Sequence, residues 1–172
     1  MLSFIKFTSL CIFKILFCII IHLLFRLCKS FFHFFAALFL LLGDSVKYKW
    51  PENGNHPIIP DVSINCDIKN RRSTTFLGVP KFIMEVLSDS TEKRDREEKM
   101  ELYKAVEVAE YWLVDWRKKQ VEIYLLVTDE SSIDTIDYKL VNVITNDNKE
   151  DLKIHVFPNV NITFEELFDG IE

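Results

Sequence analysis

Glycine and cysteine are scarce in this sequence, and their spacing excludes several kinds of site. The 172 residues contain only four glycines and four cysteines. No glycine-rich segment has the pattern of a phosphate-binding loop. The cysteines form no CxxC pair and match no zinc-ligand spacing. No Ser, His and Asp set has a recognisable catalytic spacing, and no segment repeats.

Acidic residues are absent from the first 42 positions, whose only Lys or Arg residues are Lys6, Lys14, Arg26 and Lys29. The remaining residues, 43–172, contain 17 basic and 26 acidic residues, a net charge of −9. An acidic body argues against non-specific nucleic-acid binding, which depends on Lys and Arg. It does not exclude a nuclease whose carboxylates bind a metal ion, because the ion supplies local positive charge.

The first 42 residues form a hydrophobic leader, and three interpretations of it remain open. Residues 10–25 and 30–42 are almost entirely apolar. The leader is a membrane anchor, or residues 30–42 are a buried helix of the soluble domain. Alternatively, the leader is not a selected protein sequence, for instance a shifted reading frame joined to a true domain. We therefore divide the chain into a leader, 1–42, and a body, 43–172.

The body has the pattern of a mixed α/β (α+β) domain. We predict strands at 45–50, 58–66, 81–88, 109–116, 120–127, 137–144 and 152–158, and helices at 89–108 and 162–171. Asn53-Gly54 predicts that the first two strands form a hairpin, and residues 67–80 read as a polar loop. Cys66 ends a strand, and we expect it to be a reduced, buried core residue. Nothing in the body requires an oxidising compartment, which indicates the cytoplasm.

Glu85 is the most unusual residue of the body, because it interrupts the apolar run 81–88. Such a run is typical of a central strand that is buried on both faces. A carboxylate there is costly unless it is paired or binds a metal ion. A structural arginine or backbone donors are the alternative partners.

The helix predicted at 89–108 brings a lysine towards this carboxylate. Asp95, Lys99 and Tyr103 recur every four residues and share a face with the apolar residues Leu102 and Val106. Asp89 and Glu92 have the spacing of a capping box at the start of the helix. A second acid, Asp61, stands at the start of the strand 58–66. Two acids and a lysine are the minimum set for holding a divalent metal ion beside a phosphodiester.

Several short motifs together resemble those of the Uma-two endonuclease family, within the PD-(D/E)XK restriction-endonuclease-like superfamily. The motifs are Pro60-Asp61, Gly78-x-Pro80, Glu85-Val86-Leu87-Ser88 with Ser90-Thr91, the helical Asp95, Lys99 and Tyr103, and Glu110–Asp115. The resemblance runs from about Ser45 to Phe168 and is most specific between Pro60 and Asp115.

The resemblance implies a restriction-endonuclease-like core that hydrolyses phosphodiester bonds in DNA. It implies a site for Mg²⁺, or another divalent cation such as Mn²⁺, at Asp61 and Glu85. Leu87 occupies the position of the superfamily's usual lysine, and the resemblance implies that Lys99 replaces it. Ser88, Asp95 and Tyr103 are the supporting residues implied by the same motifs. The expected partners are DNA, a second copy of the chain in a homodimer, and a membrane through residues 1–42.

The leader departs from this family pattern. The family begins with a helix and hairpin region, and nothing in residues 1–42 resembles it. Asp89 also stands where a proline is usual. The alternative to an active enzyme is therefore a catalytically inactive or truncated protein with the nuclease fold, tethered to a membrane through the leader.

Overall fold

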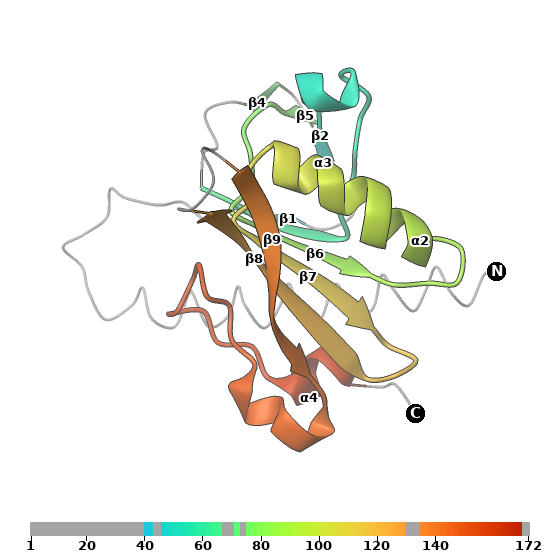
Figure 1. The fold of residues 1–172 in the computed structure, drawn as a ribbon, viewed down its shortest axis with the longest axis vertical. Coiled ribbons are helices and arrows are strands. Elements are labelled where there is room, and N and C mark those ends of the chain that lie inside the picture. The colour runs from blue at the N-terminus through green and yellow to red at the C-terminus, as the bar shows by residue number, and fades with distance from the viewer. Residues whose placement is uncertain (1–39, 43–45, 67–70, 73–74, 130–134, 170–172) are drawn as a thin grey trace.

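The computed structural model of the protein describes residues 40–42, 46–66, 71–72, 75–129 and 135–169 (Figure 1). A six-stranded mixed sheet forms its centre, with the strand order β1-β3-β6-β7-β8-β9. Its strands are β1 (Leu40–Leu42), β3 (Val62–Asn65), β6 (Phe82–Val86), β7 (Glu110–Asp115), β8 (Gln120–Asp129) and β9 (Thr135–Ile144). Only β6 and β7 run parallel among these neighbours. The predicted mixed α/β fold is confirmed.

The crossover between the parallel strands is one helical segment. It consists of α2 (Glu92–Arg94), a π-helical turn η2 (Asp95–Lys99) and α3 (Met100–Ala105). This segment covers one face of the sheet (Figure 1). The segment and this face of the sheet share a core with residues of a second, smaller sheet. Its buried apolar members are Val46, Tyr48, Trp50, Ile58, Phe76, Ile83, Leu87, Tyr103, Val106, Val108, Tyr111 and Leu113. The predicted inward face of the helix, with Tyr103 and Val106, is therefore confirmed.

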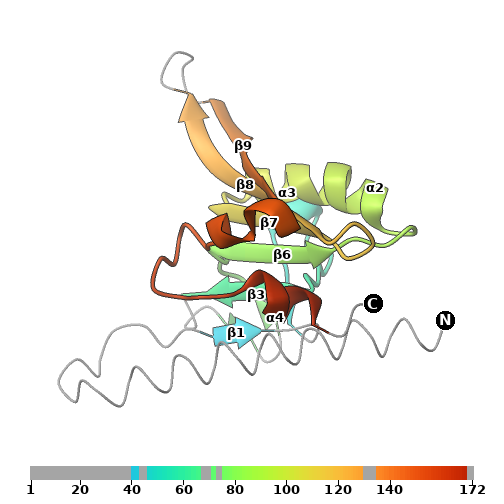
Figure 2. The ribbon, with the colours of Figure 1, turned by 90° about the horizontal axis from the view of Figure 1, so that it is seen from below.

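A short C-terminal helix lies on the opposite face of the sheet (Figure 2). This helix, α4 (Phe164–Phe168), and the 3₁₀ segment η3 (Asn146–Asp151) follow β9. The core on this face includes Met84 of β6, Trp112 of β7 and Phe164. Thr163 caps α4 in a reciprocal box with Glu166. The sheet is thus buried on both faces, as the apolar run around Glu85 indicates.

A small second sheet corrects two predictions. The strands β2 (Lys47–Tyr48), β4 (Arg71–Arg72) and β5 (Thr75–Phe76) form it in the order β2-β5-β4, so the predicted loop 67–80 contains two strands. The predicted hairpin between 45–50 and 58–66 reduces to one bridge, from Tyr48 to Ile58. Prolines at 57 and 60 flank Ile58 and lack the N–H groups that a longer ladder requires. A 3₁₀ turn, η1 (Pro51–Asn53), and Gly54 with a φ of 56° make the connection.

Two further predictions are wrong. Residues 152–158 form no strand, because the Val156 N–H donates to the buried Glu110 carboxylate at 2.8 Å instead of to a neighbouring strand. Cys66 is exposed, since it follows the last residue of β3 and leaves the layer of buried side chains.

The leader lies outside the described residues except for its last three. The backbone of Leu40–Leu42 pairs antiparallel with β3, so the end of the predicted leader contributes an edge strand to the main sheet. Residues 1–39 lie outside the described part of the chain, and so do most of the residues for which a membrane anchor or a buried helix is predicted. Among the described residues, no helix has the length and apolar character needed to cross a membrane.

Candidate active site

The two predicted acids meet where β3 begins and β6 ends. These strands are antiparallel neighbours with Val62 opposite Met84, which brings Asp61 beside Glu85. The Asp61 N–H lies 3.3 Å from Oε2 of Glu85, and the Val86 N–H donates to Oδ2 of Asp61 at 2.7 Å. The Glu85 side chain is only 1% exposed. Alternation along β6 places it on the helix side, between the buried side chains of Ile83 and Leu87.

The helical segment brings the predicted lysine to the same point. The Lys99 ammonium lies 2.9 Å from Oε2 of Glu85 and 2.8 Å from Oδ1 of Asp95. Asp95 and Lys99 are the first and last residues of the π-helical turn η2. Such turns occur often at functional sites, because the wider turn changes the direction of side chains. Four of the site residues predicted from the sequence therefore form one cluster, namely Asp61, Glu85, Asp95 and Lys99.

Two other predicted supporting residues contact different parts of the structure. The Tyr103 hydroxyl donates to Oε1 of Glu85 at 2.7 Å and is completely buried. The Ser88 hydroxyl lies 2.9 Å from the hydroxyl of Thr91 and 3.2 Å from that of Ser90. Tyr103 thus fixes the direction of the Glu85 carboxylate, whereas Ser88 shapes the turn that leads from β6 into the helix.

Burial controls the protonation of the cluster. It raises the pKa of Glu85 to about 8, although the Lys99 ammonium acts in the opposite direction. Burial also raises the pKa of Asp61, again against the influence of Lys99. For Lys99, burial alone would lower the pKa, but Glu85 and Asp95 raise it above its ordinary value. Lys99 therefore remains an ammonium at neutral pH, whereas the raised pKa of Glu85 favours its protonated form until a cation is bound.

The donor set fits a single Mg²⁺ or Mn²⁺ ion. Within the described ranges, no three His, Cys, Asp or Glu side chains are grouped to hold a metal ion, so a fully protein-made cage is absent there. Asp61 and Glu85 provide two adjacent carboxylates. Mg²⁺ is commonly held by one or two carboxylates, with water and substrate phosphate as its other ligands. Asp61 and Glu85 are thus the residues that would hold the ion.

Sequence reasoning missed a network of ion pairs beside the site. Arg117, after β7, contacts Asp89, Glu92 and Asp115, with its Nε 2.9 Å from Oδ1 of Asp115. The expected capping box of Asp89 and Glu92 does not form, because Thr91 is the N-cap and Arg117 engages both carboxylates.

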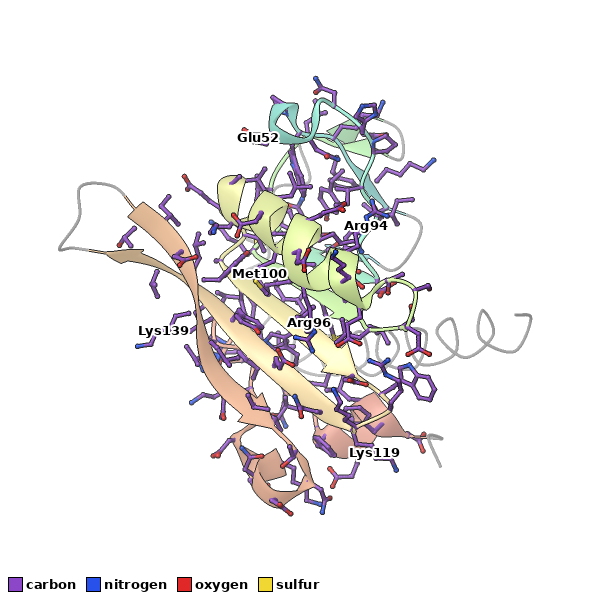
Figure 3. The ribbon with its side chains drawn as sticks, turned by 45° about the vertical axis from the view of Figure 1, so that its right-hand side comes forward. Glu52, Arg94, Arg96, Met100, Lys119 and Lys139 are labelled. Carbon is purple, nitrogen blue, oxygen red and sulfur yellow. The ribbon has the colours of Figure 1, made fainter. Side chains whose placement is uncertain are left out.

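Arg96 extends this network to β8. Its guanidinium makes two 2.8 Å hydrogen bonds to Glu122 and a third contact, at 3.0 Å, to Glu92. Figure 3 shows Arg96 between the helix and the strands, and Lys119 at the turn from β7 to β8. The spacing of four residues from Glu92 to Arg96 was the one available sequence signal. The network fastens the first turns of the helix, which carry Asp95 and Lys99, to the sheet.

Comparisons with known proteins agree with this fold. In a solved structure from Anabaena variabilis, described as a "putative nuclease belonging to DUF820", the similar region covers 77% of this chain and 69% of that one. The TM-score is 0.53 and the sequence identity 15%, so this likeness concerns the fold alone. The uncharacterized protein slr1290 of Synechocystis sp. is 41% identical over 66 residues. That match covers 38% of this chain and about a third (35%) of the Synechocystis protein.

A family profile matches most of the chain. The profile is Uma2, described as "Putative restriction endonuclease", and it matches residues 20–165. The matched region thus begins inside the hydrophobic leader, not near Ser45 as the motifs alone indicate. It includes every residue of the cluster around Glu85. The chain therefore belongs to the Uma2 family.

Proposed function

We propose that this protein is a metal-dependent endonuclease that hydrolyses phosphodiester bonds in DNA. The observation that carries the proposal is the convergence of Asp61, Glu85 and Lys99, which come from two strands and a helix. Membership of the Uma2 family supports DNA as the substrate. The site adds to this, because Asp61 and Glu85 place two carboxylates beside a lysine where β3 begins and β6 ends, a combination that suits a functional site.

Each residue has a distinct part in this reaction. Asp61 and Glu85 would hold the divalent ion, and hydrogen bonds from Val86 and Tyr103 fix the directions of their carboxylates. A bound ion supplies Lewis acidity and lowers the pKa of a water molecule. The Lys99 ammonium lies beside Glu85, where it would orient the attacking water or stabilise the negative charge that develops on the phosphate.

Cleavage of supercoiled plasmid by the full-length chain tests the proposal. With Mg²⁺ we expect nicked or linear product, and with EDTA none. Glu85→Gln removes one proposed metal ligand and should lower the rate at least about 100-fold, in the range found for groups that stabilise transition-state charge. Glu98→Gln makes the same charge change at a side chain that is 79% exposed, and it should cleave like the wild type. Equal rates for wild type and Glu85→Gln would refute a nuclease activity at this site.

A further inference from the structure

Lys99 is shared between two buried carboxylates, and only one of them belongs to the proposed metal site. Its ammonium lies 2.9 Å from Glu85 and 2.8 Å from Asp95, and the Lys99 side chain is 12% exposed. Glu85 uses the same oxygen, Oε2, for the ammonium and for the N–H of Asp61. A metal ion on Oε2 would therefore repel the ammonium at close range.

The charges of the cluster correspond to one divalent cation. In the ionised forms that metal binding requires, Asp61, Glu85 and Asp95 carry three negative charges against the single positive charge of Lys99. Two negative charges remain without compensation inside this group. A divalent cation supplies the missing charge, but it also binds the Glu85 carboxylate with which Lys99 is paired. Lys99 then needs a second partner to stay in the site.

We infer that Asp95 is a positioning residue, which retains the Lys99 ammonium beside the reacting groups while Glu85 binds the metal ion. This inference rests on the proposed function. Asp95 is suited to the role because it is four residues before Lys99 in the π-helical turn η2, and its side chain is only 2% exposed. A buried carboxylate with a purely structural purpose is rarely more stabilising than an apolar residue of similar size.

Asp95 should affect metal affinity even in the absence of DNA. Without the Asp95 charge, Lys99 has only Glu85 as a partner and competes with the metal ion for it. For the full-length chain with Mn²⁺ alone, calorimetry should show that Asp95→Asn raises the Kd at least about 10-fold, a coupling of ordinary size between sites. Asp95→Glu keeps the charge and should remain within about threefold of the wild type. Glu98→Gln, an exposed charge change three residues further along, should have no measurable effect.

A double-mutant cycle separates an action through Lys99 from direct metal binding by Asp95. In a Lys99→Met background, Asp95→Asn should change the Mn²⁺ Kd less than about threefold, because the ammonium that Asp95 positions is gone. A full 10-fold effect in that background would mean that Asp95 contacts the ion itself, and would overturn the inference. If Lys99→Met does not fold, the Mn²⁺ affinities of Asp95→Asn and Asp95→Glu are compared instead. An Asp95→Asn variant that binds Mn²⁺ as tightly as the wild type overturns the inference.

Cleavage assays on the same proteins distinguish this inference from the proposed function. A wild type that neither binds Mn²⁺ nor cleaves DNA would overturn both. A wild type that binds Mn²⁺ and cleaves DNA, together with an Asp95→Asn variant that does so equally well, would overturn the positioning role alone. The expected result is a wild type with both properties and an Asp95→Asn variant with a weakened response to Mn²⁺ in both assays.

Discussion

Glu85 is held from three directions, and this fixes its carboxylate before any ligand arrives. Tyr103 donates to one oxygen, while Lys99 and the backbone of Asp61 approach the other. Preorganised groups of this kind reduce the reorganisation that a reaction requires. At the scale of single residues, the contacts of Glu85 should therefore affect catalysis separately from stability.

Tyr103→Phe tests that separation. The change removes a buried 2.7 Å hydrogen bond to Glu85, and we expect DNA cleavage to fall about 10-fold with a loss of roughly 1–2 kcal/mol in the free energy of unfolding. Tyr138→Phe is the matched control, since the Tyr138 hydroxyl donates to the Val108 carbonyl at 2.7 Å. The control should lose similar stability in urea unfolding and keep its activity. Equal activity in both variants would contradict a positioning role for Tyr103.

Asp115 should make the stability of the protein depend on pH in the acid range. Desolvation opposes its ionisation, but Arg117 and Lys118 outweigh this and lower the pKa of Asp115 to about 2. Asp89 and Glu92 face the same guanidinium. Because the folded-state pKa is depressed, the stabilisation is complete above the unfolded value of about 4 and disappears as the pH falls towards 2.

Urea unfolding of wild type and Asp115→Asn measures this contribution. We expect a difference of roughly 1–2 kcal/mol at pH 6, since Arg117 and Lys118 are partly exposed and screened by solvent. The difference should shrink as the pH falls from 4 towards 2. The exposed Glu150→Gln serves as the control and should follow the wild type throughout. A difference that is already absent at pH 6 would show that the ion pair contributes nothing.

Residues were predictable where a polar group conflicts with its surroundings. Glu85 was identified because it interrupts an apolar run, and Lys99 because it shares a helix face with Tyr103. Arg117 gave no such signal, since it lies in a turn and its partners Asp89 and Glu92 are 28 and 25 residues away in the sequence. Cys66 was wrongly predicted as buried. It directly follows the last residue of β3, where the chain leaves the buried layer of the sheet.

At the scale of elements, the helix that carries Lys99 is attached to the sheet by its first turns. Arg96 bridges this helix to Glu122 of β8 with two 2.8 Å hydrogen bonds. We expect Arg96→Met to lower the free energy of unfolding by roughly 1–3 kcal/mol, because Glu122 then loses its main partner. Arg94→Met, at a neighbouring position that is 61% exposed, should change stability by less than about 0.5 kcal/mol. Chemical unfolding monitored by circular dichroism compares them, and equal losses would refute the attachment.

Strong periodicity predicted most of the regular elements, and tertiary contacts decided the others. The strands at β6 to β9 and the helix between β6 and β7 follow from continuous or alternating apolar patterns. The π-helical turn could not be predicted from the sequence, because its wider turn hardly disturbs a pattern of four-residue spacings. The predicted strand at 152–158 failed because the pairing of Val156 with buried Glu110 depends on a residue far away in the sequence.

At the scale of the whole molecule, the sheet extends beyond the predicted body. The backbone of Leu40–Leu42 pairs with β3, and the Uma2 match begins at residue 20. Composition divided the chain at residue 43, because the leader lacks acidic residues, but hydrogen bonding in a sheet does not depend on side-chain charge. The β8 and β9 strands project beyond the other strands of the sheet (Figure 2).

In the proposed nuclease site, a helix supplies the lysine that lies beside the metal-binding carboxylates. The most direct test is the Mg²⁺-dependent rate of DNA cleavage by full-length Lys99→Gln, compared with Lys93→Gln, an exposed lysine of the same helix. We predict at least about a 100-fold loss for Lys99→Gln and a wild-type rate for Lys93→Gln. A Lys99→Gln variant that cleaves DNA as fast as the wild type would contradict a catalytic role for this helical lysine.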